Sequence, residues 1–447
     1  MALARALGQR YLWVDALCIL QDVEVVRQQT IDDMDRIFAQ SLLTMVAGTC
    51  ESANDPLPGV TTNRSWKQRY QKVSASLTLS AHFDFRDYLE STKYNERAWT
   101  FQEYQLANRL LVFAPNGQVY FLCREAVYSE EVIVGPDMEP DAALLDGADL
   151  IKLRPDPTKL WSVYERGVHH FTARRMTYEK DILNAFTGIL RMICSERSLE
   201  GLPLPIFDLA LLWQPQQQLE RRQGFSSWSW AGWIGKVEWF DIYSLTYEGE
   251  GKTETERIAS WMKLRSWIVW YSSWGTDVRS PAYIMDGPPW LRGTAPSAEQ
   301  HEHRFPGLHH KFVPRPRSLA RSLENLEPQR RHIRYLQFWT TSAYFEIEHD
   351  RNMNFPIRSL DPETTSKGLR LFTLHDRDGR ACGWVLLNDN WVNRAANSDI
   401  RRQEFIILSE GRYSKVYPSP MKYSPDQTER PIVFEEFNVM MITTTGT

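Results

Sequence analysis

Two short stretches carry side chains whose type and spacing suit chemistry. YLWVDALCILQ (11–21) places a carboxylate, Asp15, inside an apolar run that turns polar at Gln21. NERAWTFQE (95–103) places Glu103 about one helical turn beyond Trp99. Asp15 and Gln21 follow a predicted strand, and ligands of open α/β sheets bind where the strands end at their carboxyl side. We therefore expect Asp15 and Gln21 to flank one crevice that Glu103 also faces.

Each carboxylate also has a purely structural interpretation. Asp15 would cap the turn that follows it, and Glu103 would pair with Arg97 or Arg109. For an isolated carboxylate this is the more common outcome. The cysteines and histidines show no spacing typical of a metal site, so we expect no metal.

Composition limits the classes of function. A chain of 447 residues suggests two or three domains, and 43% hydrophobic with 24% charged residues is ordinary for a globular protein. The formal net charge of -4 gives no general attraction to nucleic acid or to anionic membranes, so neither partner is expected. Five scattered cysteines and the absence of a signal-like N-terminus favour a cytoplasmic protein.

The elements that must position these residues alternate between strands and helices. Periodicity predicts a helix over 2–7, a strand over 10–14, a helix over 23–40 and a strand over 42–48. A helix follows over 97–108, and two strands (109–114 and 118–123) are joined across Pro-Asn-Gly. This order predicts an α/β fold with an open, largely parallel sheet.

Composition shifts divide the rest of the chain. We expect an α/β domain over 1–128, an acidic linker over 129–160, and a helical and tryptophan-rich region over 161–291. An Arg/His/Pro-rich loop or linker over 292–334 would then lead to a separate β-rich region over 335–447, with a hairpin turn at Asp378-Gly379. The tryptophans of FSSWSWAGW (225–233) are expected to pack in a core rather than to bind a ligand.

Together, YLWVDALCILQ and RAWTFQE (97–103) resemble the two motifs of the fungal heterokaryon incompatibility (HET) domain. SANDPLPGV (52–60) and LTMVAG (43–48) resemble the segment after its third strand and that strand itself, and the resemblance extends to about residue 240. It implies a role in non-self recognition and programmed cell death, with protein partners or self-association. It also implies that the motif residues surround the functional site: Asp15, Cys18, Gln21, Arg97, Trp99 and Gln102.

HET domains are remotely similar to TIR domains, flavodoxin-like modules of which some hydrolyse NAD. Trp99 and Glu103 stand at the spacing of the plant TIR pattern W-C-x-x-E, whose glutamate is catalytic. The resemblance therefore implies that Glu103 is a catalytic carboxylate and that NAD is a substrate, with no bound cofactor. A carboxylate can stabilise the oxocarbenium-like charge that develops as the bond to nicotinamide breaks.

HET domains usually begin with a strand of the LSYVWG type, and this sequence starts after it. We therefore expect a domain whose first strand is missing, through truncation or degeneration, and which associates through its exposed strand edges. Two hypotheses remain open. The first is a cell-death effector that cleaves NAD or another nucleotide, and the second is a non-enzymatic interaction or scaffold module.

Overall fold

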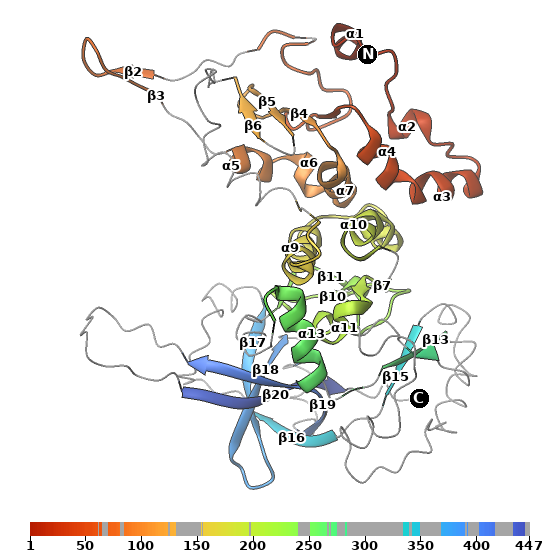
Figure 1. Cartoon of the computed structure of the whole chain (residues 1–447), viewed down its shortest axis with the longest axis vertical. Helices are drawn as coiled ribbons and strands as arrows, with labels where there is room; N and C mark the ends of the chain where they lie inside the picture. Colours follow the sequence, from red (N-terminus) through yellow and green to blue (C-terminus); the bar gives the residue numbers. More distant parts are fainter. Residues whose placement is uncertain are drawn as a thin grey trace. The chain divides into compact units, whose positions relative to one another are not determined.

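The computed structural model divides the chain into two compact units. Unit 1 comprises Met1–Pro155 and His170–Ile193, and unit 2 comprises Asp156–His169 and Cys194–Thr447. Figure 1 shows the elements of both units along the chain. The structure describes residues 1–60, 62–64, 70–80, 85–123, 126–130, 153, 155–195, 198–239, 251–265, 268, 270–274, 282–283, 334–338, 342–348, 368–388, 391, 402–415 and 432–442.

Unit 1 begins with four helices, coloured red in Figure 1. These are α1 (Ala2–Ala6), α2 (Asp15–Cys18), α3 (Glu24–Asp32) and α4 (Met34–Gln40). The helix predicted over 2–7 is confirmed, but the single helix predicted over 23–40 is broken at Asp33, which ends α3 and begins α4 with ψ of 2°. Aspartate competes with the backbone for hydrogen bonds, so it favours such a junction over a helix interior.

The strand predicted over 10–14 is wrong. Val14 is extended, with φ −136° and ψ 123°, but these residues pair with no described strand. Val14 instead precedes α2, and the Val14 N–H faces the Cys18 sulfur at 3.4 Å. An apolar extended run becomes a strand only when another strand satisfies its backbone groups, and no described strand does so here.

The sheet of unit 1 has the strand order β1-β4-β5-β6. Its strands are β1 (Thr44–Val46), β4 (Leu110–Phe113), β5 (Val119–Leu122) and β6 (Val127–Ser129). The predicted strands at 42–48, 109–114 and 118–123 are confirmed, and Gly117 makes the turn between the last two with φ +84°. Only β1 and β4 are parallel, so the expected α/β class is present with a mixed rather than a largely parallel sheet.

Two segments lead from β1 to β4. The first is an exposed hairpin of β2 (Tyr70–Lys72) and β3 (Thr78–Ser80), and the second is a helical run of α5 (Phe85–Glu90), α6 (Lys93–Glu96) and α7 (Ala98–Leu106). The helix predicted over 97–108 is thus confirmed as α7. Its Tyr104 packs in the core of the sheet with Val46, Leu110 and Tyr120.

A second buried cluster of unit 1 joins α7 to residues 170–193. This part of the chain holds the end of α9 (Leu160–Thr172), a short helix η1 (Glu179–Asp181) and α10 (Asn184–Cys194). Phe101 lies 5.7 Å from Phe171 and 6.3 Å from Phe186 between ring centroids, and all three are buried. Aromatic rings at these separations attract one another and exclude water.

Unit 2 opens with short elements around the tryptophan-rich stretch. They are β7 (Ser198–Leu199), β8 (Leu202–Pro203), η2 (Leu204–Ile206), α11 (Phe207–Ala210), β9 (Trp213–Pro215), β10 (Glu220–Arg221), η3 (Trp230–Gly232), β11 (Trp233–Ile234) and β12 (Val237–Trp239). Trp230 is buried, and its indole N–H donates to the Tyr164 hydroxyl at 3.0 Å. FSSWSWAGW thus contributes to a packed core, as its composition predicts.

The described remainder of unit 2 is mainly β-structure. Helix α13 (Glu254–Arg265) is followed by β13 (Tyr271–Trp274), β14 (Ala282–Tyr283) and β15 (Arg334–Gln337), and then by a five-stranded antiparallel sheet. The order of that sheet is β18-β17-β16-β19-β20, with β16 (Ser342–Glu348), β17 (Leu369–His375), β18 (Ala381–Asn388), β19 (Arg402–Lys415) and β20 (Ile432–Ile442). Gly379, with φ +74°, closes the predicted hairpin, and the predicted β-rich C-terminal part is confirmed.

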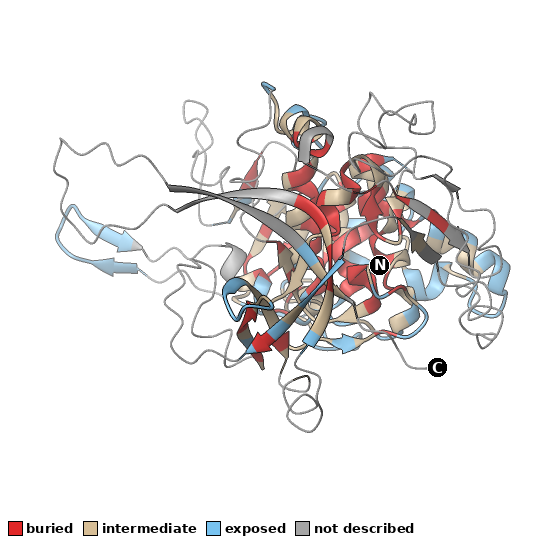
Figure 2. Cartoon of the chain, turned by 90° about the horizontal axis from the view of Figure 1, so that it is seen from below, coloured by how far each residue is buried: buried red, intermediate tan, exposed pale blue. Residues whose placement is uncertain are grey.

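Figure 2 shows where the described residues are buried. Most of the predicted acidic linker lies outside the described residues, as does the predicted 292–334 loop except Arg334, which begins β15. None of the helices in the described part of the chain has the length and hydropathy that a membrane span requires.

Candidate functional site

The stretch NERAWTFQE forms the junction of α6 and α7. Thr92 caps α6, since its hydroxyl accepts from the Asn95 N–H at 3.1 Å. Arg97 is extended and precedes α7, and the Thr100 hydroxyl donates to the Arg97 carbonyl at 2.7 Å. This geometry places Glu103 in the second turn of α7, while Ala98, Thr100, Phe101 and Gln102 are buried.

Glu103 is half-buried, and its carboxylate makes neither a hydrogen bond nor a salt bridge with any described residue. Burial raises the pKa of Glu103 to about 7. Arg97 and Arg174 lower this pKa and the negative charge of Asp15 raises it, so all three side chains act electrostatically on Glu103. The structural alternative, a salt bridge from Glu103 to Arg97 or Arg109, is not formed.

Asp15 lies at the first position of α2 and is exposed. One of its oxygens accepts from the neighbouring Ala16 N–H at 2.7 Å, but the cap position of α2 is Val14 and no side chain caps the helix, so the cap that the structural interpretation expects is not formed. It does not end a strand, because 10–14 form none. Its charge nevertheless acts on Glu103, so the two carboxylates that the sequence singled out are electrostatic neighbours.

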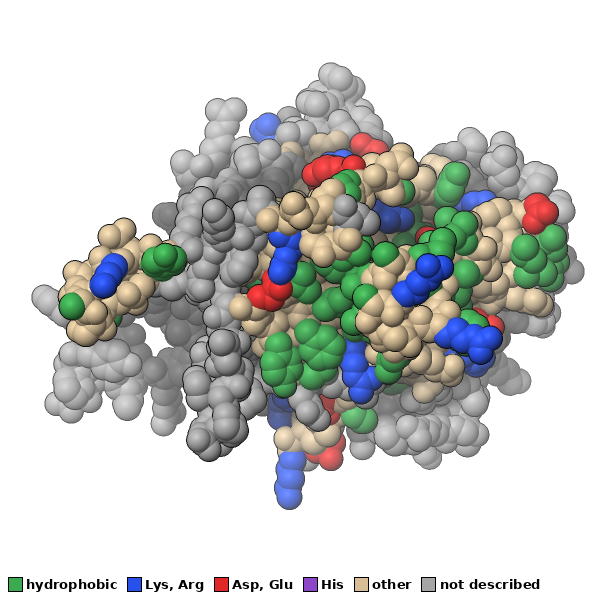
Figure 3. Space-filling model, turned by 90° about the horizontal axis from the view of Figure 1, so that it is seen from above, with side chains coloured by type: hydrophobic (Ala, Val, Ile, Leu, Met, Phe, Trp, Pro, Cys, Tyr) green, Lys and Arg blue, Asp and Glu red, His purple; other side chains and the backbone are tan. Residues whose placement is uncertain are grey.

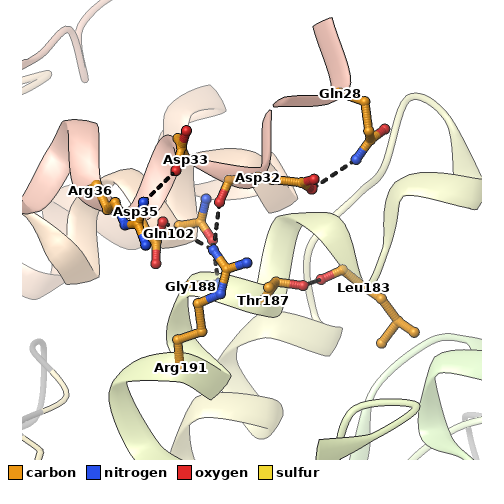
Figure 4. Close-up of polar contacts among 10 residues, drawn as sticks. All are labelled: Gln28, Asp32, Asp33, Asp35, Arg36, Gln102, Leu183, Thr187, Gly188 and Arg191. Atoms are coloured by element: carbon orange, nitrogen blue, oxygen red, sulfur yellow. Dashed lines mark hydrogen bonds and ion pairs between the residues drawn. The ribbon is translucent and has the colours of Figure 1, made fainter. Parts of the chain in front are cut away.

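The remaining motif residues differ in their surroundings. Cys18 ends α2 and is an exposed free thiol, and Gln21 is exposed three residues later. Arg97 is exposed and Trp99 is half-buried. Gln102 is buried, and its side-chain oxygen accepts from the Gly188 N–H of α10 at 2.9 Å (Figure 4). Gln102 therefore joins two helices.

Two neighbours of Glu103 were missed from the sequence. Tyr94 donates from its hydroxyl to the Thr100 carbonyl at 3.3 Å, and burial raises its pKa well above the ordinary value. Arg174 donates to the Arg97 carbonyl at 3.3 Å and to the Thr100 hydroxyl at 3.2 Å. Burial lowers the pKa of Arg174 to about 10. The only sequence signal for Arg174 is the Arg174-Arg175 pair, which periodicity and motif spacing do not distinguish from a surface pair.

The arrangement suits a reaction that develops positive charge or moves a proton near neutral pH. A carboxyl group with a pKa near 7 is partly ionised under these conditions, so it can accept a proton or stabilise a cation. The exposed guanidinium of Arg97 makes no ion pair with a described residue and could bind an anionic group beside it. Among the described residues, no cluster of three or more His, Cys, Asp or Glu side chains could hold a metal ion.

Comparison with known families gives one match. The model of the family described as Heterokaryon incompatibility protein (HET) matches residues 1–103, a range that includes both motif stretches and ends at Glu103. No curated protein and no solved structure matches the chain.

Proposed function

We propose that the protein acts in fungal non-self recognition and programmed cell death by cleaving NAD or a related nucleotide, since the heterokaryon incompatibility (HET) family model matches residues 1–103. The observation that carries the proposal is the state of Glu103. It is half-buried, has no described hydrogen-bond or salt-bridge partner, and has a pKa of about 7. A carboxylate held in this state costs stability, and such groups concentrate at functional sites.

In the proposed reaction, water hydrolyses the bond between the ribose C1′ and the nicotinamide nitrogen. The bonding electron pair leaves with nicotinamide, whose ring becomes neutral, and the oxygen of water bonds to C1′ while one proton is released. The ionised Glu103 stabilises the positive charge that develops on the ribose and accepts the proton from water. Arg97 binds a phosphate oxygen of the substrate, since its guanidinium is exposed and its positive charge acts on Glu103.

One parallel strand pair supports the relation to TIR domains that the Trp99 and Glu103 spacing suggests, while the other two pairs of the sheet are antiparallel. The parallel pair β1 and β4 is joined through α5, α6 and α7, which is the crossover that a parallel pair requires. A flavodoxin-like sheet is built from such units. Five free cysteines support a reducing compartment, so we place the protein in the cytoplasm, where NAD is available.

Expression of the full chain in a host cell tests this proposal. We expect NAD to fall over time in cells that produce the wild-type chain, and to stay constant with Glu103→Gln. Glu96→Gln is the matched control, because Glu96 is a nearby carboxylate that pairs with Lys93 at 3.1 Å on the surface. Constant NAD with the wild-type chain, or equal depletion by Glu103→Gln, would contradict the proposed activity.

A second candidate function is a non-enzymatic interaction module. The observation that favours it is the exposed apolar surface of residues 1–42. Figure 3 shows hydrophobic side chains beside Lys and Arg side chains on one face of the molecule. Helices α2 and α3 bury none of their residues. Large apolar side chains exposed over one region mark interaction sites. The exposed ones in this region are Met1, Leu7, Tyr11, Leu12, Leu17, Leu20, Val23, Val25, Val26 and Leu42.

A further inference from the structure

Residues 170–193 lie about 70 to 90 positions after the matched HET region, yet they belong to the same compact unit. They contact the Glu103 helix at two places. One is the start of α7, which Arg174 and Arg175 contact, and the other is its middle, which α10 contacts. The Glu103 site is therefore completed by a segment that the matched region does not include.

At the start of α7, Arg174 and Arg175 bind the backbone and side chains of residues 95–100. The Arg175 N–H donates to the Glu96 carbonyl at 2.6 Å, and the Ala98 N–H donates to the Arg175 carbonyl at 2.9 Å. The Arg174 guanidinium donates to the Arg97 carbonyl, the Thr100 hydroxyl and the Asn95 side-chain oxygen. One guanidinium thus holds three points around the first turn of the helix.

The same guanidinium also faces the core. Its central carbon lies 4.9 Å from the centroid of the Phe101 ring, a distance at which a cation and an aromatic face attract each other. The Arg174 Nε is buried and has no hydrogen-bond partner in the described part of the chain. A buried donor without a partner costs stability, and the three hydrogen bonds and the ring contact of the same guanidinium act against this cost.

In the middle of α7, a side chain of α7 comes close to the backbone of α10. Gln102 accepts from the Gly188 N–H, and the Arg191 guanidinium donates to the Asp32 carbonyl at 2.5 Å and contacts Asp35 at 3.3 Å (Figure 4). These contacts join α10 to α3, α4 and α7. They fix the segment from which Arg174 reaches the start of α7.

We propose that Arg174 is a positioning residue for Glu103: it fixes the first turn of α7 and supplies a second cation beside the carboxylate. The claim that this serves catalysis depends on the proposed function, but the geometric claim does not. Four groups interact electrostatically with Glu103. Asp15 comes from α2, Tyr94 from α6, Arg97 from the start of α7 and Arg174 from the following segment. Of these, only Arg174 lies outside the matched region.

Hydrogen exchange of the full chain, measured on peptides covering 95–106 and corrected for intrinsic rates, tests both parts of the proposal. Arg174→Gln removes the charge and most of the donors, while Arg174→Lys keeps the charge and removes the planar fork. Arg175→Gln is the matched control, because exposed Arg175 contacts α7 through its backbone. We expect exchange roughly tenfold faster in both Arg174 variants and unchanged in the control.

The pH dependence of this protection separates positioning from simple packing. In the wild type, protection should fall as pH rises through about 7, where Glu103 ionises. Arg174→Gln should move this fall to higher pH, because a cation that favours ionisation is lost. Arg174→Lys should leave it in place, and adding Glu103→Gln should abolish the fall in every variant.

Unchanged exchange in Arg174→Gln, or a fall that stays at the wild-type pH, would overturn the proposal. Neither result depends on NAD cleavage, so an inactive wild-type chain would refute the proposed function without deciding this inference. If the chain does cleave NAD, the pH profile of the reaction should move with the protection profile.

Discussion

The two motif stretches are equally prominent in the sequence, but their surroundings differ. In 95–103, most side chains are buried or hydrogen-bonded, and residues 170–193 contact the start and the middle of α7. In 11–21, no residue is buried, and Tyr11 and Leu17 expose 81% and 78% of their surface. Two stretches that are equally prominent in the sequence are therefore packed very differently. The stretch with Glu103 is held by contacts with residues far away in the sequence, while no described residues bury the stretch with Asp15.

The largest expected difference between the two stretches is in stability. Phe101→Ala should destabilise unit 1 by about 3 to 5 kcal/mol, because Phe101 is 1% exposed and packs on Phe171 and Phe186. Tyr11→Ala should change stability by less than about 0.5 kcal/mol. Urea unfolding followed by hydrogen exchange measures both. A similar cost for the two substitutions would show that 11–21 is packed after all.

A smaller loss is expected from the contact between α7 and α10. A Cβ added at Gly188 would lie 2.5 Å from the Gln102 side-chain oxygen and 2.7 Å from Asp35. Gly188→Ala should therefore destabilise the pair of helices by about 1 to 3 kcal/mol, even though alanine favours a helix by about 1 kcal/mol. Gly383→Ala is the control, since its Cβ would meet Leu374 at an ordinary 3.6 Å. Equal protection of α7 in the Gly188 variant and the wild type would be the contrary result.

Glu103 itself should cost stability at high pH. Its pKa of about 7 lies above the usual value of 4.5, so the folded state binds more protons than the unfolded state between these values. The contribution of Glu103 to stability should then be fully present below about pH 4.5 and be lost as pH rises through 7. Glu103→Gln should remove this loss and stabilise unit 1 by about 1 to 3 kcal/mol at pH 8. A Gln variant that is less stable than the wild type at pH 8 would show that the carboxylate is paired.

The smallest effect on stability is expected at the exposed stretch, where the change should appear in association instead. Replacing Leu17 and Leu20 by serine should reduce self-association in sedimentation velocity, with stability changed by less than about 0.5 kcal/mol. Leu79→Ser is the control, because Leu79 is 56% exposed on the β3 hairpin. If all variants sediment as the wild type does, the surface of residues 1–42 does not mediate association.

The sequence predicts features that depend on neighbouring residues and misses those that depend on residues far away in the chain. Strands β1, β4 and β5, helix α7 and the turn at Gly117 rest on local periodicity and turn residues, and these predictions are confirmed. The strand at 10–14 depended on a partner that local pattern cannot supply. Arg174 and Gly188 approach α7 from more than 70 residues away, and nothing in their own neighbourhood marks them. We expected Asp15 to lie near Glu103 because Asp15 would end a strand. The structure has no strand there, yet the charge of Asp15 still acts on Glu103.

The most direct test of the central claim is the rate of nicotinamide release from NAD by the purified full chain, measured between pH 5 and 9. We expect the rate to rise through an inflection near pH 7, where Glu103 ionises, and to vanish in Glu103→Gln. Asp15→Asn should keep the activity and move the inflection to lower pH, because a negative charge that opposes ionisation is removed. No release by the wild-type chain, or equal release by Glu103→Gln, would contradict the account.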